Sequence, residues 1–327
     1  MMLHQKDIHK VLLAGAGVMG SSFAQIFAKH GYEVILYDIA EKSLEKARGV
    51  ISVNQEAEVA SGELTAEESA ALVDRITMTT SKEYFSQADF VLESTVENME
   101  LRHAFWREAS ELVRPEIVVC TNTSGMSITE IAKAVKDPTR FTGMHWVNPP
   151  HLIPLVEVIA GEKSSDEALQ IVYDVALSLD QKPVRVYKDP TGFILNRLQY
   201  AIVREACHCV EEGYASLEDV DNVVKYGLGM RYAVVGPFET MDFGGIDIFN
   251  HVGSYMFDSL CNDGGVPLIL KKAYEEGKYG LKNGKGFYDY SGDKAEKAFL
   301  HRDQGFIAVA HSLNCLLYTS PSPRDIS

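Results

Sequence analysis

The chain of 327 residues has few cysteines, no long hydrophobic run and fewer basic than acidic residues. Five irregularly spaced cysteines are typical of a reducing compartment, so we expect a cytoplasmic protein. No apolar run approaches the roughly 20 residues of a membrane helix, and the first predicted strand begins at Lys10, which leaves no room for a signal peptide. Lys and Arg number 31 against 46 Asp and Glu, a net charge of −15. This balance argues against nucleic acid as a partner, because nucleic-acid binding requires a basic surface.

A metal site is not expected either. Cys207-His208-Cys209 is the one cluster with metal-binding residue types, but it lies in a predicted helix. Side chains two residues apart on a helix point to separate faces, so we interpret these residues as packing residues. Hydrophobic residues make up 46% of the chain and charged residues 24%, ordinary values for a globular protein large enough for two domains.

Short apolar runs with strand character alternate with helical patterns through the first part of the chain. The runs are 11–14, 34–37, 76–79, 90–93, 117–121, 141–147, 155–159 and 184–186. This alternation predicts a parallel, doubly wound sheet of the Rossmann type with right-handed crossovers. Residues 41–75 are longer than a simple crossover and are interpreted as two helices around Ser61-Gly62, a helical hairpin inserted between strands.

After Asp189-Pro190 the strand signal fades and amphipathic helical patterns follow. We therefore predict a nucleotide-binding domain over residues 1–189 and an all-α domain over 190–314. Residues 315–327 resemble the translation of a sequencing adaptor and are rich in Ser and Pro. We expect them to be a disordered, foreign tail, with the authentic sequence ending near Asn314.

The motif Gly15-Ala16-Gly17-Val18-Met19-Gly20 follows the first strand, opens a helix and precedes a second strand that ends at Asp38. This is the dinucleotide fingerprint in its required context. Its glycines allow a tight turn, close approach of the pyrophosphate and close packing of helix on strand, and the helix N-terminus attracts the phosphates. The Asp38 carboxylate suits a ribose 2′-hydroxyl and repels a 2′-phosphate, so the cofactor is predicted to be NAD. The residues expected to bind it are Gly15, Gly17, Val18, Met19, Gly20 and Asp38.

His145 and Glu157 lie in two β-rich runs separated by Asn148-Pro149-Pro150, which predicts a turn. A turn of this kind brings the imidazole and the carboxylate together. A neutral histidine accepts a proton from an alcohol, and a carboxylate on its other ring nitrogen fixes the tautomer and stabilises the imidazolium. Beside a hydride acceptor, this pair would oxidise an alcohol. The alternative is two unrelated residues.

Several motifs in the same order resemble the L-3-hydroxyacyl-CoA dehydrogenase family over residues 8 to about 311. The matching segments are 15–20 with Asp38, 93–98, 122–124, 143–149, 155–159, 192–197, 236–239 and 286–288. The resemblance implies an NAD enzyme that acts on a C3 hydroxyl, with His145 as general base and Glu157 as its partner. It also implies that Ser124 and Asn196 bind substrate or orient the histidine, and that the helical domains pair into a homodimer.

Four residues in these segments have simpler alternatives. Ser124 follows a strand at the ligand-binding edge of the sheet, but its hydroxyl would also suit the cap of a helix that starts near Ser127. Asn196 would otherwise be an ordinary polar helix residue. Glu97 and Asn98 follow another strand end, where they would line the nicotinamide-ribose pocket or begin a helix.

Two departures from the common pattern bear on the substrate. The segment 229–237, which contains Arg231, resembles the branch of L-gulonate 3-dehydrogenase and lambda-crystallin. The guanidinium of Arg231 would pair with a free carboxylate of the substrate. The alternative role for Arg231 is a surface ion pair. The segment 50–74, the family's CoA-contacting arm, is acidic and has no Lys or Arg. We predict an NAD-dependent enzyme for a small-molecule L-3-hydroxyacyl-CoA. The alternative is a dehydrogenase of a free 3-hydroxy acid, and a third possibility is a non-catalytic NAD-binding protein.

Overall fold

The computed structural model describes residues 2–62 and 64–318, without the side chains of Ser61 and residues 314–318. The chain divides into two compact units, Met1–Arg197 and Leu198–Ser327. The division falls after Arg197 rather than after the predicted residue 189. The reason is that the first turn of helix α7 (Leu195–Glu211) bonds to the first unit through Leu195 and Asn196.

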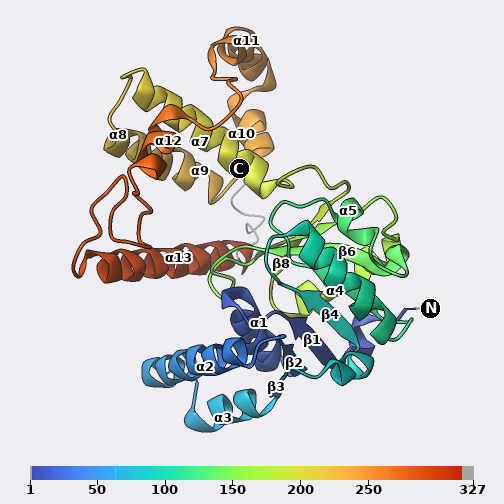
Figure 1. Cartoon of the computed structure of the whole chain (residues 1–327). Helices are drawn as coiled ribbons and strands as arrows, with labels where there is room; N and C mark the ends of the chain where they lie inside the picture. The colour runs from blue at the N-terminus through green and yellow to red at the C-terminus, as the bar shows by residue number, and fades with distance from the viewer. Residues whose placement is uncertain (1, 63, 319–327) are drawn as a thin grey trace. The chain divides into compact units, whose positions relative to one another are not determined.

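The first unit contains an eight-stranded sheet with the order β3-β2-β1-β4-β5-β6-β7-β8 (Figure 1). The strands are β1 (Lys10–Ala14), β2 (Glu33–Tyr37), β3 (Ile76–Thr79), β4 (Phe90–Glu93), β5 (Val118–Thr121), β6 (Phe141–Trp146), β7 (Leu155–Ile159) and β8 (Lys182–Val186). Every strand run expected from the sequence is present. The strands β1 to β6 are parallel, with the outward order from β1 that defines a Rossmann-type sheet.

The prediction of a parallel sheet is wrong for the last two strands. β7 runs antiparallel to β6, and β8 runs parallel to β7. The chain turns back directly after β6 through the cis Asn148–Pro149 bond and a turn in which Leu152 and Ile153 N–H donate to the Pro149 carbonyl. A direct turn of this kind joins antiparallel neighbours, whereas parallel strands need a crossover.

Alternate residues of the central strands pack against two layers of helices. Val11 and Leu13 of β1 face a core formed with α1 (Val18–Lys29), α2 (Glu41–Ser61) and α6 (Asp166–Ser178). Leu12 and Ala14 face a second core formed with α4 (Met99–Leu112) and α5 (Ile128–Ala132). Strands buried on both faces explain the nearly continuous apolar runs in the sequence.

The inserted hairpin predicted for residues 41–75 consists of α2 and α3 (Ala66–Asp74). Gly62 ends α2 in the left-handed conformation, and Thr65 and Glu68 form a capping box at the start of α3. A buried chain of hydrogen bonds runs from Ser69 through Gln55 to Gln25 of α1. This chain fixes the hairpin on the nucleotide-binding helix.

The second unit is helical. Its helices are α7, α8 (Leu217–Val223), a π-helix (Val224–Gly229), α9 (Met230–Tyr232), α10 (Pro237–Gly244), α11 (Ile246–Met256), α12 (Leu268–Glu275) and α13 (Lys294–Tyr318). Residues 315–318 of the predicted disordered tail continue α13, since the first proline of that tail is Pro321. Residues 319–327 lie outside the described residues. Within the described part of the chain, no helix is both long and apolar enough to cross a membrane.

Candidate active site

His145 and Glu157 stand directly opposite each other on the antiparallel strands β6 and β7. Opposite residues of an antiparallel pair project to the same face, so the register places the two side chains together. His145 Nδ1 lies 2.7 Å from Glu157 Oε2, and the side chains are only 5% and 1% exposed. With Nδ1–H donated to the carboxylate, Nε2 keeps its lone pair. The structure therefore brings together the pair expected from the sequence.

The second carboxylate oxygen of Glu157 accepts hydrogen bonds from the backbone N–H groups of Ile194 and Leu195, at 2.9 and 3.0 Å. These groups belong to the start of α7, where free N–H groups favour an anion. Burial alone would raise the pKa of Glu157. The hydrogen bonds from His145, Leu195 and Ile194 outweigh burial and lower that pKa below its ordinary value. Glu157 is therefore ionised at neutral pH although it is buried.

Phe193 supports the histidine and was not predicted. Its ring is fully buried, with a centroid 5.5 Å from that of His145. Its backbone adopts φ of 49°, a left-handed conformation that is rare for an aromatic residue. Gly192 before it has φ of 77°. The two successive left-handed residues, Gly192 and Phe193, pack the Phe193 ring on His145. They also direct the N–H groups of Ile194 and Leu195 to Glu157. Strain of this kind persists where the surroundings fix it and often marks functional sites.

Ser124 is held by its backbone from two sides. Its N–H donates to Glu97 Oε1 at 2.6 Å, and its carbonyl accepts from Asn196 Nδ2 at 2.8 Å. The cap of α5 is Ser127, so the alternative role for Ser124 is wrong. The exposed Ser124 hydroxyl has no partner among the described residues. Asn98 caps α4 through a bond to the Leu101 N–H, which confirms the helix-start alternative for that residue.

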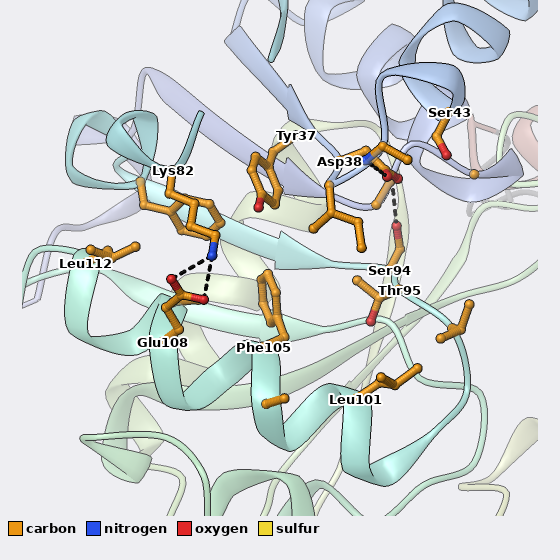
Figure 2. A pocket seen from close by; sticks show the side chains of 18 residues that line it. Tyr37, Asp38, Ser43, Lys82, Ser94, Thr95, Leu101, Phe105, Glu108 and Leu112 are labelled. Carbon is orange, nitrogen blue, oxygen red and sulfur yellow. Dashed lines mark hydrogen bonds and ion pairs between the residues drawn. The ribbon is translucent and has the colours of Figure 1, made fainter. Parts of the chain in front are cut away.

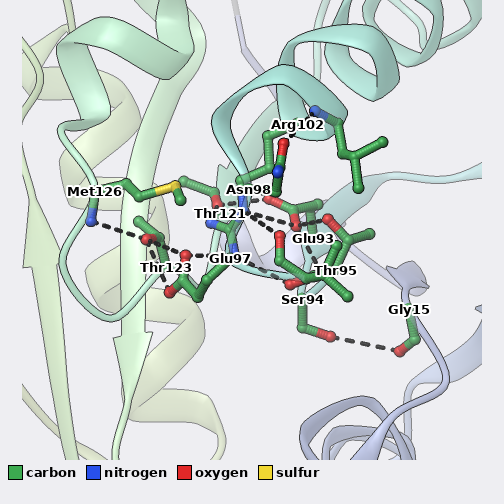
Figure 3. A network of polar contacts seen from close by, with 12 residues as sticks. Gly15, Glu93, Ser94, Thr95, Glu97, Asn98, Arg102, Thr121, Thr123 and Met126 are labelled. Carbon is green, nitrogen blue, oxygen red and sulfur yellow. Dashed lines mark hydrogen bonds and ion pairs between the residues drawn. The ribbon is translucent and has the colours of Figure 1, made fainter.

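A buried ion cluster stands behind this loop (Figure 3). Arg102, 1% exposed, lies 3.6 Å from the buried carboxylate of Glu93 and 3.1 Å from the partly exposed carboxylate of Glu97, and it donates to the Thr121 hydroxyl at 2.9 Å. Thr121 in turn donates to Glu93 at 2.6 Å. Removing one partner of such a cluster leaves an uncompensated buried charge. The cluster therefore ties β4, β5 and the loop before α4 into one rigid support for Glu97.

The glycine motif fits the pyrophosphate of a dinucleotide. A Cβ on Gly20 would lie 1.8 Å from the Gly15 carbonyl oxygen, so this position allows only glycine between helix and turn. A Cβ on Gly17 would meet no protein atom within 4 Å, which leaves space for a ligand. Gly17 also provides no side-chain cap, and the first N–H groups of α1 around Val18 and Met19 remain available for an anion.

Asp38 is fixed at the end of β2. Its two carboxylate oxygens accept from the N–H groups of Ala16 and Ala40, each at 2.9 Å. A carboxylate has about four lone-pair sites, so acceptor capacity remains for ribose hydroxyls. Asp38, Gly15 and Gly17 line one cavity of about 610 Å³ (Figure 2), a volume within the usual range for ligand sites.

Arg231 belongs to the second unit, whereas all the other predicted site residues belong to the first. It is exposed on the short helix α9. Its side chain forms no hydrogen bond or ion pair with a residue in the described ranges, so the surface ion pair weighed as its alternative role is absent there.

A dinucleotide-binding sheet with a buried histidine–carboxylate pair places this chain in the class of NAD-dependent dehydrogenases. The chain belongs to the 3-hydroxyacyl-CoA dehydrogenase family. Residues 10–190 match the family model "3-hydroxyacyl-CoA dehydrogenase, NAD binding domain", and residues 192–290 match "3-hydroxyacyl-CoA dehydrogenase, C-terminal domain". It is thus an NAD-dependent oxidoreductase of a family that acts on CH–OH groups.

Relatives with two kinds of substrate are similar to the chain. A 5-formyl-3-hydroxy-2-methylpyridine 4-carboxylate 5-dehydrogenase of Mesorhizobium japonicum is 35% identical over 94% of this chain and 98% of its own. A probable 3-hydroxybutyryl-CoA dehydrogenase of Deinococcus radiodurans is 35% identical over 84% of this chain and 98% of its own. A solved structure of the pyridine-carboxylate enzyme, an NAD⁺-dependent dismutase, has a TM-score of 0.86, 34% identity and coverage of 94% and 99%. The (S)-3-hydroxybutyryl-CoA dehydrogenase structure from Ralstonia eutropha has a TM-score of 0.73, 30% identity and coverage of 87% and 100%.

Proposed function

We propose that this enzyme interconverts an L-3-hydroxyacyl-CoA and its 3-oxo form with His145 as general base. The observation that carries the proposal is the buried contact of 2.7 Å between His145 Nδ1 and Glu157. This contact leaves Nε2 as the proton acceptor, on the same sheet that carries the dinucleotide motif. NAD, when bound, supplies the hydride acceptor.

The proposed proton path uses only side chains of the first unit. His145 Nε2 takes the hydroxyl proton as C3 loses hydride, and the ionised Glu157 stabilises the resulting imidazolium. The Ser124 hydroxyl donates to the oxygen that becomes the carbonyl. Asn196 and Glu97 hold the Ser124 backbone in place and so act as positioning residues. General base catalysis of this type contributes roughly 10² to 10⁴ in rate.

Two substrate classes have separate support. The family model and the relatives that act on 3-hydroxybutyryl-CoA favour an acyl-CoA. A free hydroxy acid is favoured by the unpaired, exposed guanidinium of Arg231 and by the relative whose name specifies a carboxylate. The acidic hairpin also favours the free acid, since Glu56, Glu67 and Glu68 are exposed there and coenzyme A carries phosphates.

A substrate panel followed by NADH absorbance tests both classes. The panel contains 3-hydroxybutyryl-CoA, free 3-hydroxybutyrate and L-gulonate. Turnover of the thioester alone supports the acyl-CoA proposal, and turnover of the free acids alone overturns it. Arg231→Met is expected to raise the KM of a free acid and to leave that of the thioester unchanged. NADH formation with none of the substrates would favour a non-catalytic NAD-binding protein.

We also propose a homodimer formed through the second unit. Ala273 is the one buried hydrophobic residue that the described part of this unit contains, and many large apolar side chains are exposed. Phe238, Phe243, Ile246 and Phe257 are each at least 66% exposed. Apolar surface on this scale marks an interaction site. Light scattering after size-exclusion chromatography should give the mass of two chains, and the mass of one chain would refute the dimer.

A further inference from the structure

An ion pair lines one end of the nucleotide cavity. The roles assigned above to the glycine motif and to Asp38 do not involve this pair. Lys82, in the short helix over Lys82–Gln87, contacts both carboxylate oxygens of Glu108 on α4, at 2.6 and 2.7 Å. Both residues line the cavity of about 610 Å³. Their side chains are 48% and 55% exposed, so the pair lies at the mouth of the cavity and is not buried in the core.

The cavity has two polar ends and an aromatic middle (Figure 2). Asp38 lies at the end near the glycine turn, and Tyr37 and Phe105 lie between it and the ion pair. Phe85 also lines the cavity, and its ring centroid lies 5.0 Å from that of Tyr37 and 6.0 Å from that of Phe105. A wall of aromatic and apolar side chains suits a flat heteroaromatic ring. With the ribose at Asp38, the adenine ring would occupy this middle region and its far edge would face the ion pair.

The pair still has hydrogen-bonding capacity when it is formed. Lys82 has three N–H donors and uses two on Glu108, whereas each carboxylate oxygen of Glu108 keeps a free lone pair. The hydrogen bonds that Lys82 donates to Glu108 raise the pKa of Lys82 above its ordinary value, so the lysine is charged at neutral pH. The pair thus offers one donor beside several acceptors. The Watson–Crick edge of adenine has the matching pattern, an acceptor at N1 beside the amino donor at N6.

We infer that the Lys82–Glu108 pair recognises the adenine edge of NAD, with Glu108 accepting from the 6-amino group and Lys82 donating to N1. The pair therefore determines base specificity at the cofactor site. Hypoxanthine reverses this pattern, because it has a carbonyl oxygen at position 6 and a hydrogen on N1. A reversed pattern leaves polar groups unpaired, which is the strongest basis for discrimination between otherwise identical ligands. The inference concerns the cofactor and is independent of the substrate class.

The test is a binding measurement without substrate. Isothermal titration calorimetry compares NADH with reduced nicotinamide hypoxanthine dinucleotide, which differs only in the base. The wild-type protein should bind NADH about tenfold more tightly, the lower end of what one well-paired base edge contributes. Glu108→Gln should lose most of this preference, because an amide also donates to the hypoxanthine oxygen. Lys82→Met is a second variant. It should also reduce the preference for NADH over the hypoxanthine dinucleotide, because it removes the donor to N1.

Glu111→Gln is the matched control. Glu111 lies on the same helix and pairs with Lys136 at 2.5 Å in the same exposed way, but it does not line the cavity. This variant should keep the wild-type preference. The inference is overturned if the wild-type protein binds the two dinucleotides equally. It is also overturned if Glu108→Gln keeps the preference, or if the control loses it to the same extent.

Discussion

Replacing Glu157 by Gln should nearly abolish turnover while the protein remains folded. The amide keeps the size of the side chain, and its oxygen still accepts from the N–H groups of Ile194 and Leu195. The amide nitrogen then faces His145 Nδ1, which must become an acceptor. This change moves the ring proton to Nε2, the atom that must accept the proton of the alcohol.

The expected magnitude follows from this change of tautomer. The same carboxylate-to-amide change in serine proteases lowers kcat by about 10⁴, because the imidazole is held in the wrong tautomer. Four decades correspond to about 5 kcal/mol in the barrier. The hydrogen bonds from the α7 backbone to residue 157 become weaker, because they change from charge-assisted to neutral. The variant no longer has to bury a charge, and this gain offsets the weaker hydrogen bonds. We therefore expect the free energy of unfolding to change by less than about 2 kcal/mol.

The assay combines kcat from NADH absorbance with nitrogen NMR of the His145 ring, which reports the tautomer directly. Glu162→Gln is the control, because Glu162 is an exposed glutamate just after β7 and undergoes the same chemical change. It should behave as the wild-type protein. A normal kcat for Glu157→Gln, or a His145 ring proton that stays on Nδ1, would exclude the role of Glu157 in fixing the tautomer.

Three further predictions concern the glycine motif and the effect of acid. Gly20→Ala should lower the free energy of unfolding by about 3 kcal/mol in urea titrations, because its Cβ would lie 1.8 Å from a backbone oxygen of Gly15; an unchanged midpoint would contradict the close packing. Gly17→Ala should leave stability unchanged and weaken NADH binding about tenfold or more, because its Cβ meets no protein atom but enters the space left for the pyrophosphate; unchanged affinity in calorimetry would contradict this. The pKa of Glu157 is lower in the folded than in the unfolded chain, so its stabilisation is complete above the unfolded pKa of about 4.3 and is lost as the pH falls through the folded value. The loss of urea stability between neutral and acid pH should therefore be smaller in Glu157→Gln, and equal acid sensitivity in both proteins would exclude this contribution.

The parts of the fold that depend on local pattern could be predicted from the sequence. The runs of β1, β4 and β5 are plain in the sequence because these strands are buried on both faces, which gives continuous apolar segments. The contact between His145 and Glu157 was also predictable. The two residues lie in short strands joined by the Asn-Pro-Pro turn, and such strands can pair in only a few registers. The direction of β7 and β8 differs from the parallel prediction because that same turn replaces a crossover.

Contacts between distant segments could not be predicted in this way. The bonds from Ile194 and Leu195 to Glu157 join residues 37 and 38 positions apart. Lys82 and Glu108 are 26 positions apart, in segments that only the sheet brings together. No periodicity or motif marks such pairs, since they depend on how packed elements meet. Gly192 before Phe193 was the one local signal for the left-handed turn under the histidine, and its consequence was missed.

In the proposed reaction, His145 removes the proton of the alcohol as hydride leaves. Single-turnover kinetics of His145→Gln with pre-bound NAD, followed by NADH absorbance, test it most directly. We predict that hydride transfer slows at least about a hundredfold while the dissociation constant of NADH stays near the wild-type value. Hydride transfer at the wild-type rate in this variant would exclude His145 as the general base.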